Sequence, residues 1–104
     1  MTRKDKSICV QHLAELRKRW LAKNDMFRLD DGWNTLSDQR VQIGGREYRE
    51  YVWSRKTSDQ TLIVFEIVRG AFLGSVHYCL GAELLEGGAC RFLADKDLWE
   101  QGIP

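Results

Sequence analysis

Residues 61–68 constrain the fold of this chain more than any other stretch. They read Thr-Leu-Ile-Val-Phe-Glu-Ile-Val, so every residue except Glu66 is apolar or β-branched. A run this apolar is typical of an interior strand with both faces covered. A carboxylate in such a strand needs a partner, because desolvation of an unpaired charge is very costly. The run therefore predicts the centre of a sheet and marks Glu66 as its special residue.

The chain on both sides of this run carries the signals of antiparallel strands and turns. Gly44-Gly45 is a two-residue hairpin signal, which sets Ile43 opposite Arg46 and Val41 opposite Tyr48. We expect strands at Arg40–Ile43, Arg46–Ser54, 60–68, Ser75–Leu84 and Ala89–Leu93, followed by a short helical turn at 95–100. Residues 25–38 show no regular pattern, but they contain several large apolar side chains. We interpret them as irregular chain packed on the body rather than as a linker.

An N-terminal helix is predicted over residues 5–23. Its apolar positions recur at spacings of four, three and four and so share one helical face, formed by Cys9, Leu13, Leu16 and Trp20. A chain of 104 residues is long enough for one core without metal or disulfide support. The predicted fold is a single α+β domain spanning 1–104. Its N-terminal helix packs on one face of a four- to five-stranded antiparallel meander sheet, and a short C-terminal helical turn follows.

Several functional classes are disfavoured by composition. No apolar stretch approaches the roughly 20 residues needed to span a bilayer, and no uninterrupted apolar segment follows the charged N-terminus. The three cysteines are odd in number and lack metal-ligand spacing, which favours reduced thiols in the cytoplasm. The two histidines lie far apart in the sequence. We expect a cytoplasmic protein with no membrane contact, no metal and no other cofactor.

The basic residues near the end of the predicted helix raise the question of nucleic-acid binding. Arg17, Lys18, Arg19 and Lys23 surround Trp20, but the formal net charge of the whole chain is only +1. Successive residues of a helix point in different directions, and Trp20 belongs to the apolar face. We interpret the cluster as an exposed helix end that complements the helix dipole. Nucleic acid is therefore not an expected partner.

The alternation of side chains along the strands indicates what surrounds Glu66. A loop at 70–73 would set Phe65 opposite Tyr78 and make one sheet face uniformly apolar. The same register sets Glu66 opposite His77 and Val64 opposite Cys79 on the other face. Phe72 and Leu73, at the tip of this loop, are either folded under the sheet or available to a partner.

A loop at 56–59 extends this second face to the preceding strand. It sets Arg49 opposite Glu66, Tyr51 opposite Val64 and Trp53 opposite Leu62. The predicted row Arg49–Glu66–His77 brings Cβ atoms within about 5 Å of their neighbours. Two interpretations stay open. The row either satisfies a half-buried sheet or a dimer interface, or forms a cleft in which Glu66 and His77 bind a polar ligand or exchange protons.

One helix cannot cover both faces of such a sheet. The second face still needs a cover, which a symmetric homodimer or segment 25–38 would supply. We therefore predict a small binding or interaction module, homodimeric, with a small molecule or a protein as a further partner. The alternative is a small enzyme that uses Glu66 and His77 for acid–base chemistry. The predicted ligand or interface residues are Glu66, His77, Arg49, Tyr51, Trp53 and Cys79.

Overall fold

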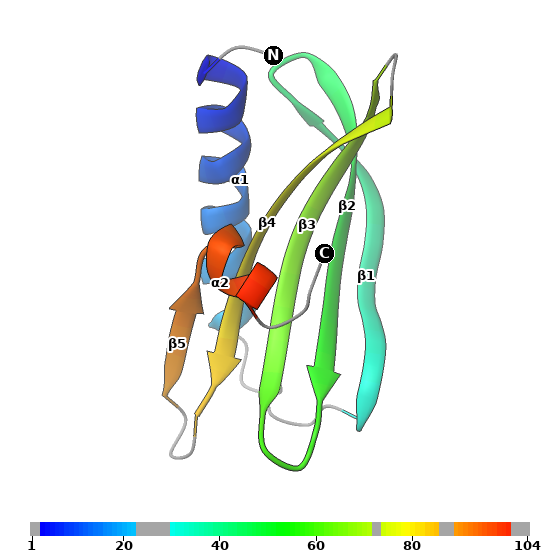
Figure 1. The fold of residues 1–104 in the computed structure, drawn as a ribbon. Coiled ribbons are helices and arrows are strands. Elements are labelled where there is room, and N and C mark those ends of the chain that lie inside the picture. The colour runs from blue at the N-terminus through cyan, green and yellow to red at the C-terminus, as the bar shows by residue number, and fades with distance from the viewer. Residues whose placement is uncertain (1–2, 23–29, 72–73, 86–88, 101–104) are drawn as a thin grey trace.

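The computed structural model describes residues 3–22, 30–71, 74–85 and 89–100 of the chain. Helix α1 (Arg3–Leu21) is followed by five strands and by the short helix α2 (Asp95–Glu100). The strands are β1 (Gly32–Ile43), β2 (Arg46–Lys56), β3 (Thr61–Ala71), β4 (Gly74–Leu84) and β5 (Cys90–Leu93). They form one antiparallel sheet in chain order, β1-β2-β3-β4-β5. The predicted α+β meander is confirmed, and Figure 1 shows α1 running alongside the curved strands.

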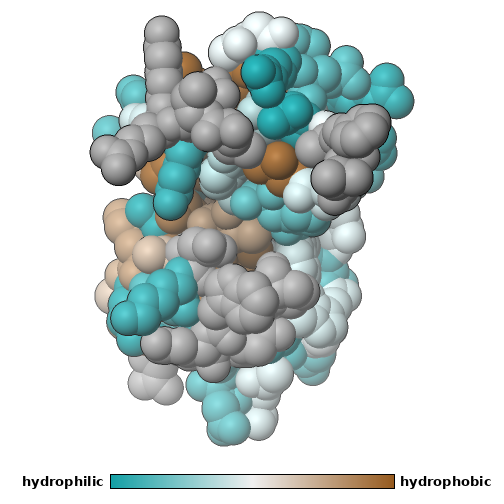
Figure 2. Space-filling model, turned by 45° about the horizontal axis from the view of Figure 1, so that its top comes forward, coloured by the Kyte–Doolittle hydropathy of each residue, from teal (hydrophilic) through white to brown (hydrophobic). Residues whose placement is uncertain are grey.

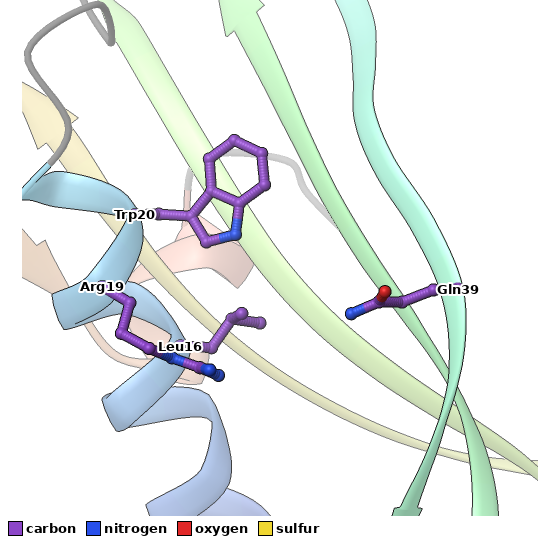
Figure 3. A pocket seen from close by; sticks show the side chains of 4 residues that line it. All are labelled: Leu16, Arg19, Trp20 and Gln39. Carbon is purple, nitrogen blue, oxygen red and sulfur yellow. The ribbon is translucent and has the colours of Figure 1, made fainter.

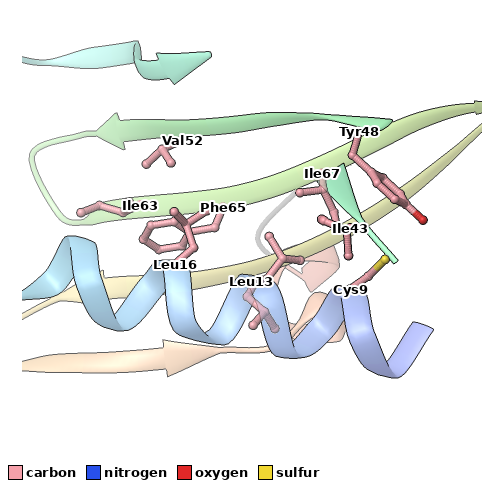
Figure 4. Packing of buried hydrophobic residues seen from close by; sticks show 10 residues of the cluster. Cys9, Leu13, Leu16, Ile43, Tyr48, Val52, Ile63, Phe65 and Ile67 are labelled. Atoms are coloured by element: carbon pink, nitrogen blue, oxygen red, sulfur yellow. The ribbon is translucent and has the colours of Figure 1, made fainter. Parts of the chain in front are cut away.

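Helix α1 covers what we call the first face of the sheet, and the opposite side is the second face. Cys9, Leu13 and Leu16 are 1%, 0% and 3% exposed, as their shared helical face predicts. Trp20 is half-buried against the same cluster. Figure 4 shows how this helix face packs on the strands. The buried strand residues that it meets are Ile43, Tyr48, Val52, Ile63, Phe65, Ile67 and Leu80.

Strand β1 is longer than the sequence predicts. The hairpin at Gly44-Gly45 is confirmed, with both glycines at positive φ and Ile43 opposite Arg46. The expected irregular structure of 25–38 is wrong for residues 32–38, which pair with β2. The register shifts between Thr35 and Ser37, where a bulge interrupts the alternation of side chains. That interruption hides the period-two signal of a strand, while residues 23–29 lie outside the described residues.

The registers at β3 differ from the predicted ones by two residues. Glu66 lies opposite Tyr51 and Cys79, not opposite Arg49 and His77. Between β2 and β3 the four-residue loop is 57–60 and not 56–59, and it is closed by the Thr57 amide, which donates to the Gln60 carbonyl at 2.8 Å. Between β3 and β4 the pairing continues to the last pair before residues 72–73, which lie outside the described residues. A shift of two keeps every side chain on its predicted face.

Part of the second face is covered by α2 and the end of β5. Leu98 of α2 and Leu93 of β5 are 1% and 2% exposed. They form a second buried cluster with Leu62, Val64 and Cys79, against which Trp53 packs. The expectation that this area needs a homodimer or segment 25–38 as its cover is therefore wrong for its apolar centre, because the C-terminal elements of the same chain cover it.

Arg17 joins α1 to β4 and to the edge strand β5. Its Nη1 donates to the carbonyl oxygens of Gly81 at 3.1 Å and Leu93 at 3.3 Å. Its guanidinium also lies 4.1 Å from the centre of the Phe92 ring. Burial lowers the pKa of Arg17 from its ordinary value. One of the four basic residues of the helix end thus has a structural role that spacing along the helix does not reveal.

Candidate functional site

Glu66 accepts hydrogen bonds from two neighbours on β4. Its Oε2 lies 3.2 Å from His77 Nδ1, and the Cys79 thiol donates to the same oxygen at 3.4 Å. The other ring nitrogen of His77, Nε2, lies 2.5 Å from Ser75 Oγ. The result is a continuous chain Ser75–His77–Glu66 along the second face. The predicted association of Glu66 with His77 forms diagonally between neighbouring strands, since the residue directly opposite Glu66 is Cys79.

Arg49 does not contact Glu66 in the way that the predicted row requires. Its guanidinium forms a bidentate pair with Asp38 of β1, with N–O distances of 2.7 and 3.1 Å. This hydrogen bonding lowers the pKa of Asp38 and raises the pKa of Arg49. Asp38 was not among the predicted site residues, because residues 25–38 were expected to be irregular. Tyr51 stands beside both pairs, opposite Asp38 on one side and Glu66 on the other.

An aromatic cluster lies on the same face, beside the polar residues. Trp33 and Trp53 have ring centroids 4.7 Å apart and planes inclined at 37°. The Arg55 guanidinium carbon lies 5.5 Å from the centroid of the Trp33 ring. Trp33 is 50% exposed, which is unusual for so large an apolar side chain. Trp53 was predicted to belong to this site, whereas Trp33 was missed because β1 was not recognised as a strand there.

A second acid–histidine pair lies on the first face and was not predicted. Glu50 of β2 is 1% exposed, and its Oε2 lies 2.6 Å from His12 Nε2 of α1. Gln39 of β1 donates through Nε2 to Glu50 Oε1 at 2.7 Å. The signal was present in the sequence, because Glu50 alternates with Tyr48 and Val52 on the apolar face. In the same way, His12 directly precedes Leu13 and lies four residues before Leu16, two buried positions of α1.

Two pockets flank helix α1. A pocket of about 250 Å³ lies between α1 and β1. A second, of about 190 Å³, lies between α1 and β4 and is lined by Lys6, Val10, Tyr78, Cys79, Leu80 and Ala94. Figure 2, which brings the top of the molecule forward, shows hydrophobic surface recessed between hydrophilic side chains. Cys79 therefore touches a pocket as well as Glu66, so the polar chain on the second face reaches the edge of an apolar hollow.

These arrangements define what the described residues can do chemically. Among residues 3–22, 30–71, 74–85 and 89–100, no group of three or more His, Cys, Asp or Glu is placed to hold a metal ion. Within the same residues, no helix is long and apolar enough to cross a membrane. Cys9, Cys79 and Cys90 are free thiols. The Cys79 thiol donates to a carboxylate, and a thiolate there would stand beside a negative charge. That placement suits a small packing residue better than a nucleophile.

No family model, no curated protein and no solved structure matches the chain. The class of protein is therefore given by the fold alone, an α+β meander with one helix on each face. The fold alone does not define a function.

Proposed function

We propose that the chain is a non-catalytic interaction module that forms a homodimer through the second face of its sheet. The observation that carries this proposal is the cluster formed by the half-exposed Trp33 with the partly buried Trp53 and Arg55. Trp, Tyr and Arg are the residues that contribute most binding energy at protein interfaces. A Trp that is half exposed yet fixed by stacking provides a rigid apolar anchor, at little further cost in conformational entropy.

The charges of the second face favour a second copy as the partner. Across a two-fold axis the same patch meets itself, so a self-complementary patch needs both signs of charge. The strand register places four carboxylates and four guanidinium groups on this face, namely Asp38, Glu47, Glu66 and Glu83 with Arg40, Arg49, Arg55 and Arg91. A net charge of +1 also gives little repulsion between two copies.

The polar residues around Glu66 have a defined role in this proposal. His77 is exposed over half of its side chain, whereas the Glu66 side chain is only 14% exposed. His77 and Ser75 would thus contact the partner directly, while Glu66 holds the imidazole in position. Tyr51 and the Arg49–Asp38 pair extend the same surface toward β1. The free thiols agree with a cytoplasmic location, which we include in the proposal.

The mass of the protein in solution tests the proposal. Light scattering after size exclusion should give about twice the 12.1 kDa of one chain for the wild type. Trp33→Ala should shift the mass toward one chain without loss of the fold, because Trp33 is half exposed. Phe92→Ala is the matched control, an aromatic residue that is 58% exposed but stands on the first face. A monomeric wild type, or equal effects of both variants, would contradict the proposal.

A small hydrolase is the second candidate function. The observation that favours it is the chain Ser75–His77–Glu66, which has the order of nucleophile, base and orienting acid found in hydrolytic triads. Ser75 and His77 are both exposed on β4, however, and neither lines either of the two pockets beside α1. We therefore rank a catalytic role second.

Ester hydrolysis separates the two candidates. Under the proposal, wild type, Ser75→Ala and His77→Ala hydrolyse p-nitrophenyl acetate at the same rate per milligram of protein. His12→Ala serves as the control for general imidazole reactivity, since His12 lies on the first face. A burst of nitrophenol that is lost only in Ser75→Ala and His77→Ala would establish the hydrolase instead.

A further inference from the structure

The pocket between α1 and β1 has the features of a small-molecule site distinct from the second face. Its described lining consists of Leu16, Arg19 and Trp20 from α1 and Gln39 from β1. Figure 3 shows the side chains from α1 extending toward β1, with the Gln39 amide pointing back toward the helix. At about 250 Å³ the volume suits a compact ligand, somewhat below that of drug-sized ligands.

Gln39 has a defined orientation in this pocket. Its side-chain amide bonds to Glu50 Oε1 at 2.7 Å. The nitrogen of the Gln39 amide is the donor in this bond and therefore faces Glu50. The Gln39 carbonyl oxygen is then directed elsewhere, and no hydrogen bond occupies it within the described residues. It is an acceptor that a ligand O–H or N–H can use.

Glu50 and His12 hold this acceptor in place. Glu50 is 1% exposed, and both of its oxygens are already engaged, one by Gln39 and the other by His12 at 2.6 Å. His12 stands one helical turn before Leu16, which lines the pocket, so the pair lies directly beside the site. The buried pair therefore preorganises the pocket wall and does not need to contact the ligand.

Arg19 provides the complementary charge. Its side chain is exposed, and within the described residues it makes no hydrogen bond or ion pair. A guanidinium binds carboxylate or phosphate oxygens with two parallel hydrogen bonds. The half-buried indole of Trp20 lies beside it in the lining of the pocket. Acceptor, cation and aromatic surface thus face one small volume.

We infer that this pocket binds a small aromatic carboxylate that carries a hydrogen-bond donor on its ring. The carboxylate pairs with Arg19, the ring lies against Trp20 and Leu16, and the donor reaches the Gln39 carbonyl oxygen. The inference is independent of the proposed homodimer, because none of these residues lies on the second face.

The probe for this site is 4-hydroxybenzoate, followed by ¹H–¹⁵N correlation NMR of the full chain. We expect saturable shifts at the Trp20 indole N–H and the Gln39 side-chain amide, with no shift at the Trp33 indole. Two analogues test the contacts from the ligand side. The neutral 4-hydroxybenzamide should bind roughly 10- to 100-fold more weakly through loss of the charged contact. The 4-methoxybenzoate, which lacks the donor, should bind roughly 3- to 10-fold more weakly.

Protein variants complete the test. Arg19→Met should weaken 4-hydroxybenzoate by at least about 10-fold, as expected for loss of a charge-assisted hydrogen bond. Lys18→Met is the matched control, since Lys18 is an exposed neighbour of the same charge that does not line the pocket. Both positions are exposed, so neither change threatens folding. Absence of saturable shifts, equal affinity for the amide, or equal loss in both variants would overturn the inference.

Discussion

The two faces of the sheet each carry a glutamate bonded to one of the two histidines of the chain, in opposite settings. On the first face, Glu50 is 1% exposed and its oxygen lies 2.6 Å from His12. On the second face, Glu66 and His77 are 3.2 Å apart, and half of the His77 side chain is exposed. The same residue pair therefore supports the core in one place and presents polar groups to solvent in the other. Burial, not residue type, separates the two roles.

The largest difference in unfolding free energy between the two faces is expected from one core substitution on each face. Leu13 and Leu98 are 0% and 1% exposed, but Leu13 belongs to the large cluster under α1 and Leu98 to the small one under α2. Leu13→Ala should lower the free energy of unfolding by about 3–5 kcal/mol. Leu98→Ala should lower it by about 2 kcal/mol, since the short helix can adjust. Urea unfolding measures both, and a larger loss for Leu98→Ala would reverse this ranking of the faces.

The histidines should give the next largest contrast. His12→Ala leaves a buried Glu50 oxygen without its partner, so we expect a loss of about 2–3 kcal/mol in unfolding free energy. His77→Ala should change stability by less than about 0.5 kcal/mol, because half of the His77 side chain is exposed to water. Thermal and urea unfolding of the two variants at one protein concentration provide the comparison. Equal losses would mean that the two pairs do not differ in role.

Gly81 tests how closely α2 approaches the second face. A Cβ built on Gly81 would lie 2.7 Å from Leu98 Cδ2 and 3.2 Å from the Ile63 carbonyl oxygen. Gly81→Ala should therefore displace the Leu98 side chain and cost about 1–2 kcal/mol. In a Leu98→Ala background the same change should cost less than half as much. An unchanged cost there would show that the backbone of β3, and not α2, sets the limit.

A smaller effect, on the dependence of folding stability on pH, is expected from the acids of the second face. Hydrogen bonds from Gln60 and, to a smaller extent, from Arg91 lower the pKa of Glu83. The hydrogen bond from Arg49 lowers the pKa of Asp38. A lowered carboxyl pKa stabilises the folded state above the ordinary range of that group, and this contribution is lost as pH falls through the folded-state pKa. Gln60→Ala should raise the pKa of Glu83 and leave that of Asp38 unchanged. Carboxyl ¹³C NMR titration measures both groups, and a parallel rise in Asp38 would contradict the assigned cause.

The sequence was sufficient for the fold because the strongest patterns are local. The spacing of Cys9, Leu13 and Leu16 predicts the buried face of α1, and Gly44-Gly45 predicts the β1–β2 register. Assignment of side chains to faces also holds, because both errors in register were of two residues. Residues 32–38 could not be recognised as a strand, since the bulge between Thr35 and Ser37 interrupts the alternation.

For the candidate site, the sequence predicted the face but not all of the contacts. Glu66, His77 and Cys79 do meet, whereas Arg49 bonds to Asp38. The pairing of a side chain with its diagonal neighbour depends on rotamers, which strand parity does not determine. The contact of His12 with Glu50 depends on how α1 is placed over β2. No local pattern specifies that placement, although the parity of Glu50 already marked it as facing the core.

We propose that the second face of the sheet, and not the first, mediates association. The most direct measurement is a dilution series by ¹⁹F NMR of protein labelled with 5-fluorotryptophan, which gives each tryptophan its own resonance. We predict that the resonances of Trp33 and Trp53 shift with protein concentration, while that of Trp20 on the first face stays constant. A concentration-dependent shift of the Trp20 resonance with a constant Trp33 resonance, or constant resonances throughout, would contradict association through the second face.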